Sequence, residues 1–185
     1  VAIVPEDILE TVNQLTAEFW PGPLTLILPK HPDVPDLVTS GLATVAVRQS
    51  AHSVFRAVCK ELGRPIAAPS ANRFGRISPT SASAVIKELD GRIPLVLDAG
   101  ACSEGVESTI ISIEPRDGKK PIFRLHRAGP ITKEQLQAFG RVEKIREVKS
   151  DAPLAPGQLA SHYAPLTPLT LLENPSDFHP EEGKK

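Results

Sequence analysis

Hydrophobic residues recur every three or four positions near the start of the chain, as they do on one face of an amphipathic helix. These residues are Ile8, Val12, Leu15 and Phe19. Pro5 suits the first turn of such a helix, and the segment 20–23, Trp-Pro-Gly-Pro, ends it because proline cannot continue a helix. The pattern therefore predicts a helix from about residue 5 to residue 19.

Two later segments have the same periodicity. Residues 52–63 repeat the apolar spacing and end at Gly63, a common residue after the last helical turn. The side chains expected to face inward are Val54, Phe55, Val58 and Leu62. The second segment has Ser78 in the N-cap position, Pro79 in the first turn and an apolar stripe that stops before Asp90.

Short β-rich runs alternate with these helices. They are predicted at residues 24–28, 44–48, 65–68, 95–97, 108–113 and 122–125. The last two runs are expected to pair across the polar loop 116–120, whereas residues 31–39 are expected to be a connector. A short helix is predicted from Thr132, where Gln135 has the spacing of a capping box. This order of elements predicts an α/β sheet with mixed strand directions.

A change of composition near Ser150 predicts a domain boundary. From Asp151 onward the chain has six prolines in 35 residues and little helical periodicity, as in an extended linker. We expect one domain over residues 1–148, and a Pro-rich linker with the start of a truncated C-terminal domain over 149–185, where a strand is expected at 166–172. Because the chain starts Val-Ala-Ile-Val and has no methionine, we interpret it as a fragment of a longer protein.

Composition and charge exclude several classes of protein. With 41% hydrophobic and 23% charged residues, the chain has the composition of a globular domain and not of a disordered or collagen-like chain. No apolar run approaches the roughly 20 residues that a membrane helix needs, and the two cysteines have neither a disulfide framework nor a zinc spacing. A net charge of −1 disfavours a basic nucleic-acid arm, though not a local basic cleft. We expect a cytoplasmic protein with no structural metal.

Polar side chains follow one of the predicted strands and precede one of the predicted helices. Ser70 and Asn72 follow the run at 65–68 and offer a hydroxyl and an amide to phosphate or carboxylate oxygens, although the same residue types form ordinary turns. Arg76 and Ser78 precede the helix, where a phosphate can bind, although helix capping alone explains the serine. Each segment therefore has a structural and a functional interpretation.

A carboxylate and three arginines are further candidates. Glu107, in a glycine-containing loop, can orient an amine or a cation, or it is an exposed turn acid. Arg48 ends a predicted strand, and Arg124 and Arg127 lie near the end of the last one, where a guanidinium suits a carboxylate or phosphate ligand. Arg124 and His126 are expected on one face of their strand. For each arginine taken singly, a solvated surface position is an equally good explanation.

Seven motifs, in this order, resemble those of the YrdC-like threonylcarbamoyl-AMP synthases. They are Phe-Trp-Pro-Gly-Pro-Leu-Thr at 19–25, Thr-Val-Ala-Val-Arg at 44–48, Pro-Ser-Ala-Asn at 69–72, Gly-Arg with Ser-Pro-Thr at 75–80, Gly-Val-Glu-Ser-Thr at 105–109, Arg-Ala-Gly at 127–129, and Ala-Pro-Gly followed by His-Tyr-Ala-Pro at 155–165. The resemblance covers about residues 4–166. The last motif is similar to the linker of the long members of the family.

The resemblance implies a twisted open sheet of mixed strands with flanking helices around a large concave cavity. It implies a nucleotidyltransferase that condenses L-threonine, bicarbonate and ATP into threonylcarbamoyl-adenylate and releases pyrophosphate. Mg²⁺ would enter with ATP, held mostly by phosphates and water. A separate transferase complex would then use the product to modify tRNA, and weak binding of tRNA or double-stranded RNA fits a basic cavity.

The resemblance also implies roles for individual residues. Ser70 and Asn72 match a catalytic Ser-x-Asn pair. The expected contacts to threonine are Arg48, the backbone at Ala68, and Ser108. The expected contacts to the nucleotide are Thr44, Ser70, Ser78, Arg127 and Ala155.

Two differences from the family pattern affect these expectations. The Lys-x-Arg pair that family members carry upstream does not occur in the chain, nor do the first strand and helices of their domain. Ala155 stands where the family linker has a serine, so a hydroxyl contact is lost there.

Two other functions stay open. One is a domain that forms carbamoyl-adenylate for a carbamoyltransferase, which the linker motif at 155–165 disfavours. The other is a non-catalytic RNA-binding module, which the net charge of −1 disfavours because RNA affinity depends on phosphate neutralisation.

Overall fold

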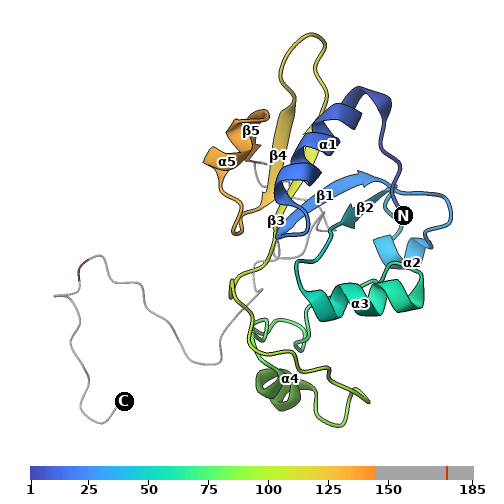
Figure 1. Ribbon diagram of the computed structural model, residues 1–185, viewed down its shortest axis with the longest axis vertical. Coiled ribbons are helices and arrows are strands. Elements are labelled where there is room, and N and C mark those ends of the chain that lie inside the picture. The colour runs from blue at the N-terminus through green and yellow to red at the C-terminus, as the bar shows by residue number, and fades with distance from the viewer. Residues whose placement is uncertain (145–173, 175–185) are drawn as a thin grey trace.

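The computed structural model describes residues 1–144 and Asn174 and arranges them around one five-stranded sheet (Figure 1). Its strands are β1 (Leu24–Pro29), β2 (Thr44–Val47), β3 (Thr109–Glu114), β4 (Ile122–Arg127) and β5 (Arg141–Lys144). Its helices are α1 (Glu6–Phe19), α2 (Asp36–Thr39), α3 (Ser53–Leu62), α4 (Ala82–Leu89) and α5 (Lys133–Gln137). Across the sheet the strands follow the order β2-β1-β3-β4-β5.

The sheet contains both parallel and antiparallel pairs. β1 lies between β2, which is antiparallel to it, and β3, which is parallel to it. β4 is antiparallel to β3 and parallel to β5. These pairings confirm the predicted α/β class with a mixed sheet and flanking helices. They also mean that β1 and β3 begin at the edge of the sheet where β2 and β4 end.

One face of the sheet packs against α1 (Figure 1). The core combines the predicted apolar face of α1 with alternate residues of the strands and with one residue of α5. Its buried members are Ile8, Val12, Leu15, Phe19, Leu24, Leu26, Leu28, Ile111, Phe123, Leu136 and Val142. Because side chains alternate along a strand, Thr25 lies on the opposite face of β1 from its two leucine neighbours.

The ends of α1 and α5 agree with the sequence signals. α1 begins directly after Pro5, and the turn that follows it is closed by a hydrogen bond from Trp20 Nε1 to the carbonyl oxygen of Leu24, at 2.7 Å. α5 begins after Thr132, whose capping box with Gln135 is complete: the hydroxyl accepts from the Gln135 backbone N–H, and the Gln135 amide oxygen accepts from the Thr132 backbone N–H. Both helices therefore begin where local chemistry predicts.

The prediction for α3 is right about the helix and wrong about its burial. The helix ends at Gly63, whose φ of 63° is the left-handed conformation that glycine adopts readily. Its apolar face is not buried, since Val54 is 39% and Leu62 is 56% exposed. Apolar periodicity identifies the helical face, but it contains no information about the element that would cover that face.

α4 begins three residues later than predicted. Ser81 and not Ser78 is the N-cap, and its hydroxyl accepts a hydrogen bond from the backbone N–H of Ala84 at 3.3 Å. The hydroxyl of Ser78 instead donates to the carboxylate of Glu107 at 2.8 Å. The local pattern assigns the Ser78 hydroxyl to helix capping, but in the structure this hydroxyl binds a carboxylate 29 positions away.

Two predicted strands do not form, and two elements form without having been predicted. Residues 65–68 and 95–97 lie outside the sheet, and Leu95 and Leu97 are 70% and 59% exposed. A short apolar run does not reveal whether a partner strand is available. β5 forms by parallel pairing with β4, and α2 forms directly after Pro35, which suits a helix start.

The predicted boundary at residue 148 lies outside the described residues. The linker at 149–185, apart from Asn174, and the strand at 166–172 lie outside them as well, so all three stay predictions. Among residues 1–144, no helix has both the length and the apolar character that crossing a membrane requires.

Candidate functional site

The strand directions bring polar segments together at one end of the sheet. Thr25 is the second residue of β1, and Ser108 comes directly before β3, the parallel neighbour of β1. Arg48 comes directly after β2, and Arg127 is the last residue of β4. Because β2 and β4 run against β1 and β3, all four residues lie at the same edge of the sheet. Three of them are predicted site residues.

Arg127 makes the most described contacts in this group. Its Nε donates to the backbone carbonyl of Ser108 and its Nη2 to the Ser108 hydroxyl, both at 2.9 Å. Its Nη1 forms an ion pair with Oε2 of Glu107. The guanidinium side chain is 17% exposed, so these contacts hold it in one orientation at the sheet edge.

The contacts of Arg127 extend on both sides. On one side, Oε1 of Glu107 accepts from the hydroxyl of Ser78 at 2.8 Å. On the other side, the hydroxyls of Ser108 and Thr25 are 2.8 Å apart and hydrogen-bonded. The result is an unbroken chain of side-chain contacts, Ser78–Glu107–Arg127–Ser108–Thr25, which we call the polar chain. It connects the loop before α4 to three strands of the sheet.

Gly129 allows this close arrangement. A Cβ atom added at residue 129 would lie 2.4 Å from the carbonyl oxygen of Glu107 and 2.4 Å from the backbone N of Thr109. The segment after β4 therefore packs directly on the backbone that carries Glu107 and Ser108, and the hydroxyl of Thr109 donates to the carbonyl of Ile131 at 2.8 Å. Only glycine fits this contact without a backbone shift.

Thr25 and Gly129 have no role predicted from the sequence, although both lie in the motifs at 19–25 and 127–129. The signal for Thr25 is its position between two buried leucines of β1, where alternation places it on the other face of the sheet. It is only 7% exposed, so its hydroxyl needs a partner inside the protein. The signal for Gly129 is weaker, because a glycine after a strand also occurs in ordinary turns.

Arg48 lies in the electrostatic field of Arg127. Burial lowers the pKa of the Arg48 guanidinium, and the positive charge of Arg127 lowers it further. Taken with Glu107, the described ionic groups of this cluster carry two positive charges and one negative charge. Two cations at this edge of the sheet favour the binding of a carboxylate or phosphate.

Asn72 closes its own loop. Its amide nitrogen donates to the carbonyls of Arg73 at 2.9 Å and Arg76 at 3.0 Å, while its oxygen Oδ1 is buried without a hydrogen-bond partner. Ser70 and Ala68 are exposed. The strand expected at 65–68, directly before Ser70 and Asn72, does not form, and the loop contacts the polar chain through Ser78.

One predicted nucleotide contact, Thr44, lies away from the polar chain, and another falls on a residue that the structure does not describe. Thr44 begins β2 and pairs with Pro29, whereas Arg48 follows the other end of that strand. Four residues of extended chain, roughly 13 Å, separate Thr44 from Arg48. Ala155 lies outside the described residues.

Arg76, Arg124 and His126 have other partners. Arg76 pairs with Glu88 of α4 at 3.1 Å. Arg124 pairs with carboxylates on β3 and β5, and its hydrogen bonds to the β3 carboxylate are the main reason that its pKa is raised. His126 Nε2 is 2.9 Å from the hydroxyl of Ser112, and burial lowers the pKa of the imidazole. These side chains stabilise the sheet and the loop packing instead of joining the polar chain.

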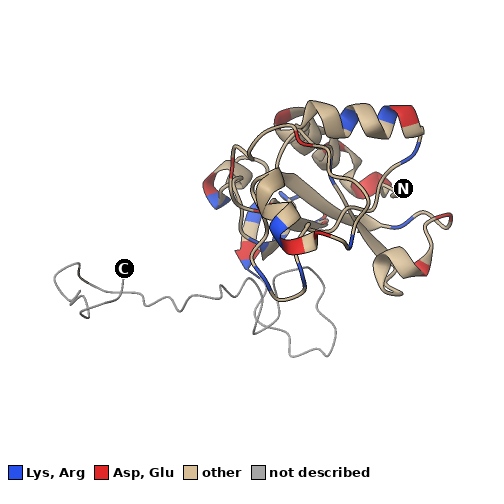
Figure 2. Ribbon diagram, turned by 90° about the horizontal axis from the view of Figure 1, so that it is seen from below, with Lys and Arg blue, Asp and Glu red and all other residues tan. Residues whose placement is uncertain are grey.

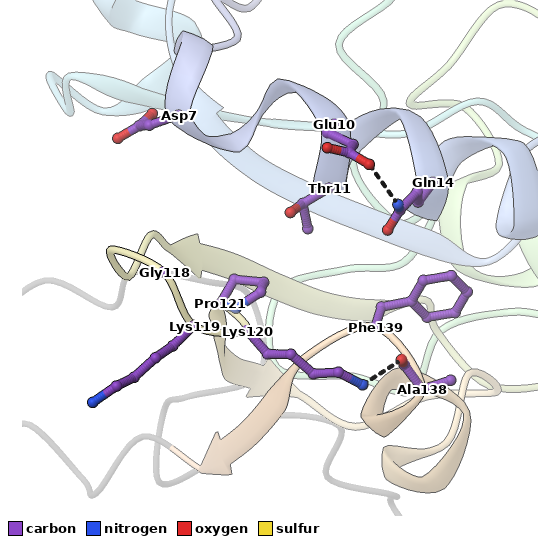
Figure 3. A pocket seen from close by; sticks show the side chains of 10 residues that line it. All are labelled: Asp7, Glu10, Thr11, Gln14, Gly118, Lys119, Lys120, Pro121, Ala138 and Phe139. Atoms are coloured by element: carbon purple, nitrogen blue, oxygen red, sulfur yellow. Dashed lines mark hydrogen bonds between the residues drawn. The ribbon is translucent and has the colours of Figure 1, made fainter.

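A hollow of about 470 Å³ lies between α1 and the turn that joins β3 to β4 (Figure 3). Its lining includes Asp7 and Glu10 on one side and Lys119 and Lys120 on the other, and none of the predicted site residues. Charges of both signs are likewise interspersed over the rest of the described ribbon (Figure 2). Residues 1–144 contain no group of three or more His, Cys, Asp or Glu side chains placed to hold a metal ion.

Two family models match the chain and together cover most of it. The Sua5/YciO/YrdC model, described as "Telomere recombination", matches residues 2–126. A model described as "Threonylcarbamoyl-AMP synthase, C-terminal domain" matches residues 131–185.

Curated relatives of the chain are named threonylcarbamoyl-AMP synthases. The threonylcarbamoyl-AMP synthase of Bacillus subtilis is 45% identical over 168 residues, which are 89% of this chain and 47% of that protein. The synthase of Pyrococcus abyssi is 38% identical over 178 residues, 95% of this chain and 51% of that protein. The chain thus spans about half the length of the curated relatives it matches.

A solved structure supports the same relationship. The crystal structure of Pyrococcus abyssi Sua5 complexed with L-threonine superposes with a TM-score of 0.74 at 39% sequence identity, over 88% of this chain and 46% of that one. Fold, motifs and family models therefore agree, and the chain belongs to the Sua5/YciO/YrdC family.

Proposed function

We propose that this chain forms part of a threonylcarbamoyl-AMP synthase, a nucleotidyltransferase that condenses L-threonine, bicarbonate and ATP into threonylcarbamoyl-adenylate and pyrophosphate. The relatives with this name and the relative bound to L-threonine support the proposal. The structural observation that carries it is the placement of Arg48 in the electrostatic field of Arg127, which itself donates to the Ser108 hydroxyl. Two guanidiniums and a hydroxyl are the groups that an amino-acid carboxylate and a polyphosphate require.

The roles divide along the polar chain. Arg48 binds the carboxylate of threonine, and Ser108, held by Thr25 and Arg127, offers its hydroxyl to the same substrate. Arg127 and Ser78 contact the nucleotide. In this arrangement the threonine side of the site lies against β1 and β3, and the nucleotide side lies toward the loop that precedes α4.

The remaining residue assignments are part of the same proposal. Asn72 has a buried oxygen without a hydrogen-bond partner, which suits an N–H or O–H donor on a ligand. Ser70 is its catalytic partner, and the backbone at Ala68 lines the threonine pocket. Thr44 and Ala155 are proposed as nucleotide contacts on the resemblance alone.

The chemistry requires positioning and charge neutralisation. The threonine amine and bicarbonate give a carbamate with loss of water, an oxygen of that carbamate bonds to the α-phosphorus of ATP, and the bond to pyrophosphate breaks. The negative charge that develops on the leaving pyrophosphate is stabilised by fixed guanidinium groups, which need no reorganisation during the step. Contacts with Glu107 and with the carbonyl and hydroxyl of Ser108 hold Arg127 for this purpose.

The cellular setting follows from the proposed reaction. Mg²⁺ enters bound to ATP, with phosphate and water as its main ligands. The product is consumed by a tRNA-modifying transferase complex in the cytoplasm, and weak tRNA or double-stranded RNA binding accompanies the transfer.

The test measures pyrophosphate release from ATP in bicarbonate buffer, with and without L-threonine, using the full gene product that contains this chain. We expect threonine-dependent release, and a decrease of roughly ten- to a hundredfold in Arg127→Gln, the cost of removing a charged hydrogen-bonding group. Arg116→Gln is the matched control, because residue 116 lies beyond the opposite end of β3. Release that does not depend on threonine, or salt-sensitive RNA binding without ATP turnover, would contradict the proposal.

A further inference from the structure

Glu107 holds two parts of the site that are distant in sequence. One carboxylate oxygen accepts from Ser78, in the loop before α4, and the other pairs with Arg127, at the end of β4. The side chain is 25% exposed, which is low for a carboxylate in a loop. The exposed turn acid that the sequence allowed is therefore not what the structure contains.

The charge of Glu107 matters because Arg127 has a second cation beside it. Burial lowers the pKa of Arg48, and the positive charge of Arg127 lowers it further. A carboxylate against Arg127 offsets part of the repulsion and keeps the guanidinium directed at Ser108. An uncharged side chain of the same size, such as glutamine, would fill the same volume but would not offset the repulsion between the two arginines.

The hydrogen bond of Ser78 matters because few buried side chains hold the loop that contains this residue. Ile77 is 53% and Val106 is 65% exposed, so the two facing segments are not held together by buried apolar side chains at these positions. The hydrogen bond between Ser78 and Glu107 joins them through polar groups instead. Moving either segment would separate Ser78 from Arg127.

From these contacts we propose that Glu107 is a positioning residue that couples the two substrate subsites. It holds the nucleotide side, Ser78 and Arg127, in register with the threonine side, Ser108 and Arg48. Because the polar chain joins the two subsites, a substrate bound at one end stabilises the arrangement to which the second substrate binds. This inference rests on the proposed function, because it takes the two ligands from it.

The test is a measurement of coupling. ATP is titrated calorimetrically into the full gene product with and without saturating L-threonine, in bicarbonate-free buffer so that no product forms. For the wild type we expect threonine to tighten ATP binding about tenfold, within the range typical of coupled sites. In Glu107→Gln each substrate alone should bind with an affinity within about threefold of wild type. Threonine should no longer change the ATP affinity of this variant, so the ratio of the two dissociation constants should be about one.

Three further variants make the result specific. Glu107→Asp keeps the charge and should retain part of the coupling. Ser78→Ala breaks the same link from the loop side without removing the ion pair, so it should also reduce coupling, and the double variant should lose no more than the larger single effect. Glu104→Gln makes the same chemical change at an exposed acid in the same loop and should keep the wild-type coupling.

Each other outcome has a definite meaning. Equal coupling in Glu107→Gln and wild type would overturn the inference, as would a tighter ATP affinity in the variant, which would show that Glu107 competes with the substrate for Arg127. A wild type that binds both ligands without coupling overturns the inference alone. A wild type that binds neither ligand overturns the proposed function and the inference with it.

Discussion

Arg48 and Arg127 reach the same edge of the sheet from different strands, and the charge of Arg127 together with burial lowers the pKa of Arg48. Burial is the larger of the two causes. Arginine stays protonated in proteins despite such a shift, so both positions remain cationic at physiological pH. Two positive charges are therefore maintained at this edge of the sheet. A lysine at residue 48 would lose its proton more readily, because its ordinary pKa is lower than that of arginine.

Arg48→Lys tests why arginine occupies this position. The ordinary pKa of lysine is about 10.4, and both burial and a neighbouring cation lower it. The charged form exists below the pKa and is lost as the pH rises through it. We expect L-threonine binding by Arg48→Lys to weaken relative to wild type between about pH 7 and pH 9.5.

Calorimetric titrations at several pH values check this, and the ratio of variant to wild-type dissociation constants cancels the titration of the ligand itself. Arg116→Lys, at the other end of β3, should show a constant ratio near one. A constant ratio for Arg48→Lys would mean that the guanidinium of Arg48 does not contact the substrate carboxylate.

Leu15→Ala tests the core between α1 and the sheet. Leu15 is fully buried, so its truncation leaves a cavity and should lower the free energy of unfolding by about 2–5 kcal/mol. Leu37→Ala removes the same atoms from a side chain that is 93% exposed, and it should change stability by less than about 0.5 kcal/mol. Urea unfolding followed by circular dichroism measures both, and equal effects would refute the assignment of the core.

Sequence pattern predicted those parts of the fold whose signals are local. α1 follows from its apolar spacing and Pro5, and α5 from the capping box of Thr132. The β3–β4 hairpin follows from two β-rich runs with a short polar loop between them. In each case the residues that determine the structure lie within one short segment of the chain, the longest being the β3–β4 hairpin with the pair Ile110 and Arg127.

The predictions that are wrong concern segments whose structure depends on a partner far away in the sequence. The hydroxyl of Ser78 does not cap α4 because Glu107, 29 residues away, accepts its hydrogen bond. The runs at 65–68 and 95–97 lack a partner strand in the described residues, which no local pattern reveals. The candidate site shows the same limitation of local patterns. The sequence motifs identify Arg48, Ser108 and Arg127 separately, and only the strand order shows that all three lie at the same edge of the sheet.

Gly129→Ala tests the close packing behind the polar chain. The added methyl group would lie 2.4 Å from the backbone of residues 107 and 109, so the segment after β4 must move away from Glu107 and Ser108. We expect a loss of stability of about 1–3 kcal/mol, as for other overpacked sites, together with weaker ATP binding.

Gly118→Ala separates this effect from the general cost of replacing glycine. Gly118 has a φ of 62° but no atom within 4 Å of an added Cβ, and it lies in the β3–β4 turn. Its substitution should cost roughly 1–2 kcal/mol through backbone strain alone and leave ATP affinity unchanged. Unchanged ATP affinity in Gly129→Ala as well would show that this packing does not position the site.

His126 gives a prediction for the dependence of stability on pH. Burial lowers the pKa of its imidazole in the folded protein, so in the interval just below the ordinary value of about 6.5 the unfolded chain binds more protons than the folded one. Stability therefore falls as the pH decreases through this interval, and His126→Gln removes this contribution. Urea unfolding at a series of pH values should give parallel stability curves for wild type and His126→Gln above about pH 7.5. Below that pH the wild type should lose stability more steeply, and curves that stay parallel to pH 5 would show that the folded protein accommodates the protonated imidazole beside Ser112 without cost.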